Sequence, residues 1–356
     1  MTTVRTFTSS TLAPADRGRE LGERHRTEIR RTIAAYRRLF AARATRPFEV
    51  DPWAEQAWAT IGELAPGAAL EIAGIAEGAR VPAHEVAMLN ARTELLAVAD
   101  PTGVVDECST VVALPENGPP VAVQTWDWYD AMSDDWFVWT IPHPDGHVVR
   151  TVTEYGVLGK IGVSSRGIGV LFNMLRHSDD AFAEEKGLGF PVHLLSRQIL
   201  DTAGDLDDAL AQATAVSPSA STSLTVVDSG GRTASVELFP GGPGVVRPED
   251  GLLVRTNHFL SDEGAVGCLA STIGPSSEIR RATLLDAFGG QTPGHAEEVL
   301  TAMHDHKDVG GVCAHPDRTM DPLLQHATLA TVVVDVEARQ LRAGAGGPCA
   351  RPVSDR

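Results

Sequence analysis

Hydrophobic residues in the first hundred positions recur at intervals of three and four, which is the spacing of one face of an α-helix. Leu21, Ile29, Ile33 and Tyr36 illustrate the pattern, and many of the positions between them are arginines. The spacing predicts helices over residues 15–44, 52–64, 68–79 and 82–99, and the last begins at a proline, as helices often do. The chain is therefore expected to begin with a helical region.

After residue 110 the apolar positions form short runs or alternate with polar ones, as is typical of β-strands. Turn sequences such as Pro-Asp-Gly separate these runs. The pattern predicts strands over residues 111–114, 121–126, 136–141, 147–154, 159–164, 168–173, 223–228, 234–239, 244–247, 252–257, 328–335 and 340–345. Helices are predicted over residues 192–203, 206–215, 276–287 and 293–304, with Asp205 as an N-cap. Such blocks predict an α+β fold in stacked layers, with helices outside antiparallel sheets.

Composition and charge restrict the possible partners. With 356 residues, of which 43% are hydrophobic, the chain is long enough for one large or two ordinary domains. The net charge of −17 argues against a nucleic-acid partner, because such binding depends on lysines and arginines that neutralise phosphates. The first residues lack the apolar core of a secretory signal, and no apolar run approaches the roughly 18 residues of a membrane span. We expect a cytoplasmic protein without a membrane partner.

The four cysteines, Cys108, Cys268, Cys313 and Cys349, are widely spaced and form no C-x-x-C pair, so they do not predict a disulfide framework. Cys108 differs in context, because it opens a predicted strand after the helical region. If the protein itself cuts the bond between Glu107 and Cys108, the freed α-amine lies beside the thiol. Such an amine has a pKa of about 7.7–8.0, close to neutral, and can serve as the general base for the thiol.

Aromatic and acidic residues gather just after the second predicted strand. Trp126, Trp128 and Tyr129 surround Asp127, and three further carboxylates follow at positions 130, 134 and 135. One interpretation is that the rings pack the core and the carboxylates lie on a turn. The other is a pocket that contacts the substrate and receives a cationic amine through cation–π and carboxylate contacts.

The stretch from His304 to His315 carries side chains that can bind zinc. It contains His304, Asp305, His306, Cys313 and His315, but the Cys-Ala-His spacing matches no standard zinc finger. The first two histidines also end a predicted helix, where a cation complements the helix dipole. We expect no metal and no cofactor, with a zinc-dependent hydrolase using His304, His306, Cys313 and His315 as the alternative.

Short motifs follow one another in a fixed order over nearly the whole chain. They are Glu107-Cys108-Ser109-Thr110, Gln124-Thr125-Trp126-Asp127, residues 159–173, Gly189-Phe190-Pro191, Thr256-Asn257-His258-Phe259, Ser276-Ser277-Glu278-Ile279-Arg280, Asp305-His306, Val312-Cys313-Ala314-His315, Thr328-Leu329 and Gly346-Gly347-Pro348. In this order the chain resembles the acyl-coenzyme A:6-aminopenicillanic acid acyltransferase family, which belongs to the cysteine-type N-terminal nucleophile hydrolases.

The resemblance implies a four-layer αββα sandwich made as a precursor that cuts itself before Cys108. The products would be a small subunit, residues 1–107, and a large subunit, residues 108–356, which stay associated. Cys108 would be the nucleophile, Asp127 would lie beside the new amine, and Asn257 would donate an amide N–H to the oxyanion. His258 beside it, with the aromatic residues near Asp127, is expected to contact the substrate.

These residue types suit acyl transfer on physical grounds. A donor aimed at the tetrahedral oxyanion contributes about 3–4 kcal/mol, and the side-chain amide of Asn257 donates without titrating. The carboxylate of Asp127 would raise the pKa of a nearby cationic amine. We expect hydrolysis or transfer of a small linear N-acyl amide or acyl thioester, with a non-catalytic binding module as a further alternative.

Three positions depart from the pattern of the best-known acyltransferases. Glu107 replaces a glycine before the nucleophile, which alters the bond to be cut. Thr125 replaces an asparagine, which alters one hydrogen-bonding group of the pocket. Leu323-Leu324-Gln325-His326 lies where those enzymes carry a Ser-Arg pair. The resemblance therefore does not extend to a penicillin-type substrate site.

Overall fold

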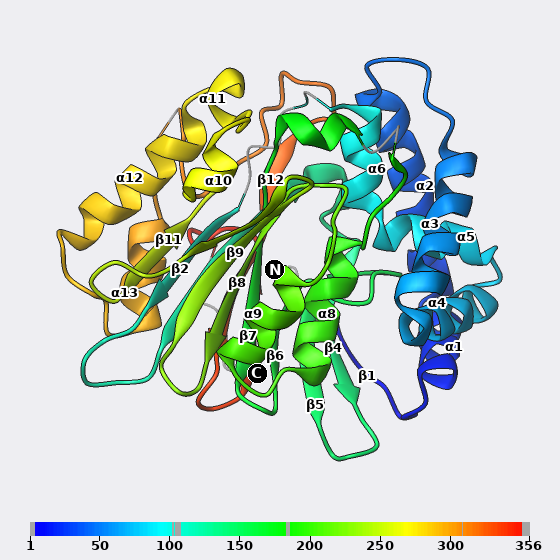
Figure 1. Ribbon diagram of the computed structural model, residues 1–356, viewed down its shortest axis with the longest axis horizontal. Coiled ribbons are helices and arrows are strands. Elements are labelled where there is room, and N and C mark those ends of the chain that lie inside the picture. The colour runs from blue at the N-terminus through cyan, green and yellow to red at the C-terminus, as the bar shows by residue number, and fades with distance from the viewer. Residues whose placement is uncertain (1–3, 102, 104–107, 183–185, 308, 351–356) are drawn as a thin grey trace.

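The computed structural model describes residues 4–101, 103, 108–182, 186–307 and 309–350. Two β-sheets are stacked face to face, with helices covering the outer face of each (Figure 1). The helical region at the N-terminus lies beside the sandwich, at the right of the view. The expected α+β class and the four-layer αββα arrangement are confirmed.

The larger sheet has eight strands in the order β1-β4-β5-β6-β7-β8-β9-β10. All neighbouring strands in it are antiparallel except β1 and β4, which pair in parallel. In chain order the strands are β1 Thr6–Thr8, β4 Trp136–Pro142, β5 Val148–Glu154, β6 Ile161–Ser164, β7 Ile168–Met174, β8 Thr222–Asp228, β9 Thr233–Phe239 and β10 Gly242–Val246.

The smaller sheet has five antiparallel strands in the order β11-β2-β3-β12-β13. Their bounds are β2 Ser109–Ala113, β3 Val121–Tyr129, β11 Leu252–Arg255, β12 His326–Asp335 and β13 Gln340–Ala345. Both faces of a central strand are covered, so β2 and β3 are buried along their whole length. This burial explains why apolar residues occur on both faces of these strands, because a strand with one solvated face would alternate.

Helix pairs cover the outer faces of the two sheets. The larger sheet is covered by α8 Val192–Thr202 and α9 Leu206–Thr214, and the smaller by α12 Ser276–Phe288 and α13 Ala296–Met303. The expected cap of α9 is confirmed, since the Asp205 carboxylate accepts the backbone N–H of Asp208 at 2.9 Å. This hydrogen bond satisfies one of the backbone N–H groups that have no partner within the helix at its N-terminus.

Over its described residues, 4–101 and 103, the N-terminal region forms six helices instead of the four predicted. They are α1 Pro14–Arg24, α2 Arg26–Arg43, α3 Val50–Leu64, α4 Pro66–Ala79, α5 Ala83–Asn90 and α6 Arg92–Ala99. The predicted helix 15–44 breaks at His25 and the predicted helix 82–99 breaks at Ala91, where the backbone leaves helical angles. Both breaks preserve the apolar spacing, so the pattern alone does not reveal them.

Helices α1 and α4 pack with their backbones in contact, which depends on glycine. A Cβ atom at Gly18 would lie 2.1 Å from the carbonyl oxygen of Glu71, and one at Gly74 would lie 2.1 Å from that of Ala15. No side chain fits at such distances, so the two glycines determine how closely these helices approach.

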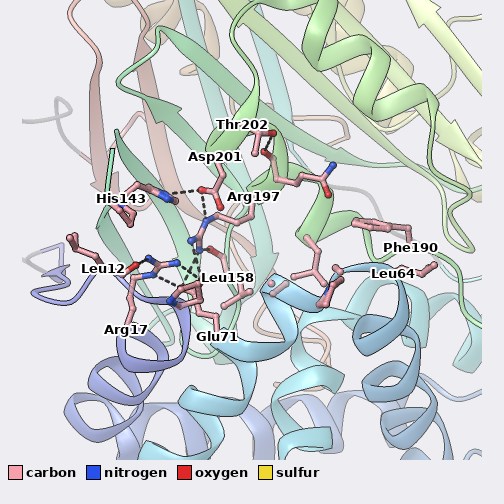
Figure 2. A pocket seen from close by; sticks show the side chains of 18 residues that line it. Leu12, Arg17, Leu64, Glu71, His143, Leu158, Phe190, Arg197, Asp201 and Thr202 are labelled. Atoms are coloured by element: carbon pink, nitrogen blue, oxygen red, sulfur yellow. Dashed lines mark hydrogen bonds and ion pairs between the residues drawn. The ribbon is translucent and has the colours of Figure 1, made fainter. Parts of the chain in front are cut away.

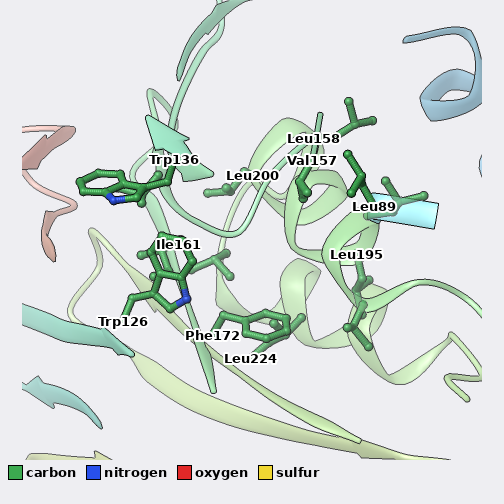
Figure 3. Packing of buried hydrophobic residues seen from close by; sticks show 14 of the residues in the cluster. Leu89, Trp126, Trp136, Val157, Leu158, Ile161, Phe172, Leu195, Leu200 and Leu224 are labelled. Carbon is green, nitrogen blue, oxygen red and sulfur yellow. The ribbon is translucent and has the colours of Figure 1, made fainter. Parts of the chain in front are cut away.

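The core between the sheets is large and aromatic. Trp126 of β3 lies near Ile161 of β6 and Phe172 of β7, with Trp136 and Leu224 close by (Figure 3). All five side chains are buried. Burial of one such side chain stabilises the fold by about 1.5–3 kcal/mol. These side chains therefore contribute much of the free energy that holds the two sheets together.

Several short elements were not predicted from the sequence. They are β1, the helices α10 Asp262–Ala265 and α11 Ala270–Ile273, and the 3₁₀ turns η1 Asp130–Met132 and η2 Ser178–Phe182. Each is too short to establish a period, and tertiary contacts hold it in place. No helix in the described ranges combines the length and apolarity that crossing a membrane requires.

Buried polar contacts join the N-terminal region to the sandwich. Arg92 of α6 binds Glu154 of β5 at 2.8 Å, with both side chains at 1% exposure or less. Glu71 of α4 binds Arg197 of α8 at 3.2 Å. Strand β1 adds a third connection, because it pairs with β4 at the edge of the larger sheet. The two regions therefore share one interior.

Candidate active site

Cys108 lies immediately before β2 and is 3% exposed. Its φ angle is +55°, in the left-handed region that residues with a side chain rarely adopt. Such a conformation costs about 1–2 kcal/mol, so the surrounding contacts must hold it. Glu107, the other half of the predicted cleavage site, lies outside the described residues.

Two side chains hold the main-chain carbonyl of Cys108. The Asn173 amide donates to this oxygen at 3.0 Å, and the Arg280 guanidinium donates to it at the same distance. Thr110 fixes the asparagine by donating to its Oδ1 at 2.8 Å. The thiol Sγ lies 3.7 Å from the main-chain oxygen of Asp127. Cys108 is thus fixed at both its carbonyl and its sulfur.

Arg280 of α12 connects Cys108 to Asn257. Its Nη1 donates to the Cys108 carbonyl and, at 2.9 Å, to the Ser109 hydroxyl, while its Nη2 donates to Asn257 Oδ1 at 2.8 Å. The arginine is 2% exposed. One buried guanidinium therefore joins the predicted nucleophile to the predicted oxyanion donor.

The orientation of the Asn257 amide follows from its partners. Its Oδ1 faces Arg280, so its Nδ2 points the other way and donates to the Met174 carbonyl at 2.9 Å. The backbone N–H of Asn257 donates to the Ser277 hydroxyl at 2.7 Å. These contacts exclude a flipped amide, since the oxygen would then face a carbonyl.

A buried ion pair supports the loop that carries Asn257. Arg255 and Glu237 are both inaccessible to solvent and meet at 2.6 Å. The same carboxylate accepts the backbone N–H groups of Leu260 and Ser261 at 2.7 and 2.9 Å. The loop is therefore held on both sides of Asn257, which makes its position part of the folded core.

His258 points toward Ser277 and Thr256. Its Nδ1 lies 2.8 Å from the Ser277 hydroxyl. Burial, followed by the nearby Arg255, lowers its pKa to about 4. The ring is therefore neutral at pH 7, and its low basicity makes it a weak general base. Its predicted contact with substrate stays a prediction.

Asp127 lies on β3 at 2% exposure, in register with Thr328 of β12. Two residues earlier, the Thr125 hydroxyl accepts the Ser109 N–H at 3.2 Å. This threonine, at the position where the resemblance predicts an asparagine, thus contacts the residue after the predicted nucleophile. The structure brings the Cys108 thiol to the main-chain oxygen of Asp127, and the role of the Asp127 carboxylate stays a prediction.

The aromatic residues near Asp127 are buried and already contact cations of the chain. Lys160 Nζ lies 3.7 Å from the ring centre of Trp126, and the Arg92 guanidinium lies 4.2 Å from that of Trp128. Tyr129 packs on His326, with ring centres 4.2 Å apart. This arrangement corresponds to the core interpretation of these rings, and a role in substrate binding stays a prediction.

The carboxylates in the same stretch are also paired within the chain. Asp130 binds Arg318, Asp134 lies 3.7 Å from Arg5, and Asp135 binds Arg31. Their charges are therefore balanced locally, and the cationic-amine pocket gains no support from them.

A cavity of about 570 Å³ lies between α1, α4 and α8 (Figure 2). Arg17 and Arg197 both bind Glu71 at its wall. None of the three predicted catalytic residues lines this cavity. Its charged groups neutralise one another and join the N-terminal helices to α8, so we assign it no part in the chemistry.

A separate group of side chains contains most of the predicted zinc ligands. His306, Cys313, His315 and Cys349 place one ligand atom each within 4.8 Å of one another. The predicted ligands include His304, which lies outside this group, and lack Cys349. The Cys349 Sγ lies 3.4 Å from His315 Nε2, although the two residues are 34 positions apart. Spacing along the chain gave no indication of this contact.

Sequence reasoning also missed the roles of Arg280 and Asn173. Both lie inside quoted motifs, but neither was assigned a function. A signal existed for Arg280, because Ser277, Arg280 and Leu284 follow helical spacing and form the buried face of α12. An arginine on an apolar face needs a buried partner, and here the partners are Cys108 and Asn257.

Among curated proteins, the chain is similar to the 40 kDa form of the acyl-coenzyme A:6-aminopenicillanic-acid-acyltransferase of Emericella nidulans. The two are 30% identical over 198 residues, which is 54% of this chain and 52% of that protein. The chain thus matches about half the length of this relative.

Among solved structures, a penicillin V acylase from Agrobacterium tumefaciens matches with a TM-score of 0.46 and 15% identity, over 67% of this chain and 83% of that one. A variant of the conjugated bile acid hydrolase of Clostridium perfringens matches with a TM-score of 0.44 and 12% identity, over 67% and 89%.

A family profile covers more of the chain than the curated relative does. The profile described as acyl-coenzyme A:6-aminopenicillanic acid acyl-transferase matches residues 113–349, which include Asp127, Asn257 and Arg280. Because this match spans well over half of the 356 residues, the chain belongs to the acyl-coenzyme A:6-aminopenicillanic acid acyltransferase family.

Proposed function

We propose that this protein is a self-processing cysteine amidohydrolase or acyltransferase that acts on a small linear N-acyl amide or acyl thioester through an acyl-Cys108 intermediate. The observation that carries the proposal is the contact of Arg280 with both the Cys108 carbonyl and Asn257 Oδ1. It fixes the distance between a nucleophile at a strand start and an amide donor. The family assignment supports the same reaction class.

Maturation would begin with attack of the Cys108 thiol on the carbonyl carbon of Glu107. The C–N bond to Cys108 breaks, its nitrogen takes the thiol proton, and a thioester joins the two residues. Water then cleaves the thioester, which leaves a carboxylate on Glu107 and a free thiol and α-amine on Cys108. The left-handed backbone of Cys108 supports this step, because cleavage releases a strain of about 1–2 kcal/mol.

In turnover, the sulfur attacks the acyl carbonyl of the substrate and the α-amine accepts the thiol proton. An N–H of Asn257 stabilises the oxyanion, and the protonated amine returns its proton to the leaving amine. Water or an acceptor amine then attacks the acyl-enzyme. We propose that Asp127 holds the ammonium and raises its pKa, since a nearby opposite charge favours the charged form.

The two products of cleavage would remain together. The Arg92–Glu154 and Glu71–Arg197 pairs each join residues 1–107 to residues 108–356 across a buried interface. Removing one partner of a buried pair typically costs about 3–5 kcal/mol, because the other charge is left uncompensated. Processing therefore changes the connectivity of the chain and leaves its interior intact.

A denaturing gel with N-terminal sequencing of the purified protein tests this proposal. We expect two bands, with the larger starting at Cys108, and a single uncut band for Cys108→Ala. Cys268→Ala is the matched control, because this half-buried thiol lies outside the site and its loss should leave cutting and turnover unchanged.

Turnover is measured by mass spectrometry on a set of N-acyl amines and acyl thioesters. We expect the wild-type protein to hydrolyse at least one of them and the Cys108→Ala variant to hydrolyse none. A single full-length band in an active preparation would refute the mechanism. A full-length band together with no alkylation by iodoacetamide and no turnover would favour the non-catalytic module.

A further inference from the structure

Four side chains from two distant segments meet beside the smaller sheet. His306, Cys313 and His315 belong to the loop after α13, and Cys349 follows β13. In the part of the chain that the structure describes, this is the one group of three or more histidines, cysteines and carboxylates found at metal-binding distances. The mechanism proposed for Cys108 uses none of them.

The separations within this His/Cys cluster match a tetrahedral zinc site. Cys313 Sγ lies 3.4 Å from Cys349 Sγ and 3.8 Å from His315 Nε2, and Cys349 Sγ lies 3.4 Å from the same nitrogen. Zinc bonds of about 2.3 Å to sulfur and about 2.0–2.1 Å to nitrogen place ligand atoms roughly 3.3–3.8 Å apart in a tetrahedron. The His306 ligand atom lies within 4.8 Å of the other three.

The backbone of the His/Cys cluster is held in place independently of any ion. The Cys313 N–H donates to the Asp305 carbonyl at 3.0 Å, which closes the loop between His306 and Cys313. Ala314 is anchored on β12, because its N–H donates to the Thr328 hydroxyl at 2.9 Å and its carbonyl accepts the Thr328 N–H at 3.0 Å. The first thiol is therefore fixed against the sheet.

A glycine allows the second segment to approach. A Cβ atom at Gly347 would lie 2.3 Å from Cys313 Sγ, so no residue with a side chain fits there without displacing the thiol. The chain passes directly over Cys313 at this glycine and places Cys349 beside it. The contact between the two thiols is thus built into the path of the backbone.

We propose that His306, Cys313, His315 and Cys349 bind one Zn²⁺ as a structural ion. Thiolate and imidazole are the ligands that zinc prefers, and four protein ligands leave no open position for water or substrate. Binding releases the two thiol protons, and the two thiolates balance the charge of the ion. The ion is therefore distinct from the catalytic zinc considered as an alternative function.

The position of the His/Cys cluster indicates what the ion stabilises. Thr328, which anchors Ala314, is in register with Asp127 of the neighbouring strand. A zinc ion here would fasten the loop 304–315 and the segment after β13 to the end of the sheet that carries Asp127. We expect it to add stability to this end of the sandwich without taking part in acyl transfer.

The primary test is the zinc content of the tag-free protein, measured by inductively coupled plasma mass spectrometry. We expect one zinc ion per chain in the wild type and in the uncut Cys108→Ala variant, which makes the result independent of the proposed function. The double variant Cys313→Ser, Cys349→Ser should lose the ion. His304→Asn and Cys268→Ser are matched controls that should retain it.

A second readout keeps the test valid if the double variant fails to fold. The wild-type protein is stripped with a chelator and reconstituted with Co²⁺. We expect the strong visible bands of tetrahedral cobalt and a thiolate-to-cobalt charge-transfer band, together with a Tm that falls on stripping and recovers with Zn²⁺. Wild-type protein with no more zinc than the double variant, or without the cobalt spectrum, would overturn the proposal. So would a Cys313–Cys349 disulfide found by peptide mapping of freshly purified protein.

Discussion

Cys108 and Cys313 are equally buried, at 3% exposure each, but their surroundings differ. The carbonyl of Cys108 is held by an amide and a guanidinium, on a strained backbone at the start of a strand. Cys313 faces a second thiol and an imidazole. Burial alone would make both of them inert core residues. Their neighbours instead indicate a nucleophile in one region and a metal ligand in the other.

The largest expected effect separates the two cysteines directly. Cys108→Ala should abolish self-cleavage and reduce turnover by several orders of magnitude, because a covalent mechanism has no substitute for its nucleophile. Cys313→Ala should still cut itself, since no step of that reaction uses this thiol. A gel and a rate measurement on both variants suffice, and loss of cutting in both would remove the distinction.

Asn257 provides the next test of the Cys108 region. Asn257→Ala removes the proposed oxyanion donor and should lower kcat by about 10²–10³, the usual effect of losing one such group. Asn257→Asp keeps the size and the contact with Arg280 but replaces the donor by an acceptor, and it should be equally slow. Steady-state kinetics on matured protein give the result, and an unchanged kcat in either variant would exclude the assigned role.

Arg280 provides a further test of the Cys108 region, because its guanidinium contacts both the Cys108 carbonyl and Asn257 Oδ1. Arg280→Ala leaves the Cys108 carbonyl and Asn257 Oδ1 without this donor, and should lower the free energy of unfolding by about 1.5–3 kcal/mol. We expect slower self-cleavage as well. The neighbouring Arg281→Ala is the control, because Arg281 contacts only the Val254 carbonyl among the hydrogen bonds described. Chemical denaturation compares the two, and equal losses would contradict the special position of Arg280.

The smallest expected effect is on the pH dependence of stability, and it comes from a third buried titratable group, the carboxyl of Glu94. Glu94 is inaccessible to solvent, and burial raises its pKa to about 7 even though its carboxylate accepts the Val192 N–H. The folded protein therefore holds a proton that the unfolded chain releases near pH 4.5, so this contribution to stability is complete at acid pH and is lost as the pH rises through about 7. Stability falls by about 1.4 kcal/mol per pH unit between about pH 4.5 and pH 7, and the slope vanishes above pH 7, where both states have lost the proton.

The pH dependence is measured by urea denaturation of the uncut Cys108→Ala protein between pH 5 and 8. Glu94→Gln should flatten this decline, because glutamine mimics the protonated acid. Asp180, whose pKa burial raises to about 6, contributes with the same sign at slightly lower pH. His258 acts with the opposite sign below about pH 6.5, since its pKa is lowered from 6.5 to about 4, but it contributes equally to the variant and to the parent protein. An unchanged slope in Glu94→Gln would show that Glu94 is already ionised.

The sequence predicted most long elements because each has a clear period over many residues. Strands β2 to β9 and helices α8, α9, α12 and α13 lie within a few residues of their predicted ranges. It could not predict the break at His25, because the apolar face continues across it. Strand β1 was missed for a different reason, since three residues carry no pattern and its partner lies 132 positions away.

In the candidate site, too, the sequence predicted single residues but not the contacts between distant segments. Cys108, Asp127 and Asn257 were named from motifs, but the pattern of one segment says nothing about which other segment folds against it. The contact of Arg280 with Cys108 spans 172 positions, and that of Cys313 with Cys349 depends on a glycine that allows two backbones to meet. Long-range contacts of this kind required the three-dimensional structure.

Strand β1 has a consequence for how the protein can be produced. It covers Val138–Thr140 of β4, at what would otherwise be the open edge of the eight-stranded sheet. Exposed strand edges pair readily with other chains and lead to aggregation. Residues 108–356 made without the N-terminal region would expose this edge, and we expect them to precipitate unless residues 1–107 are supplied at the same time.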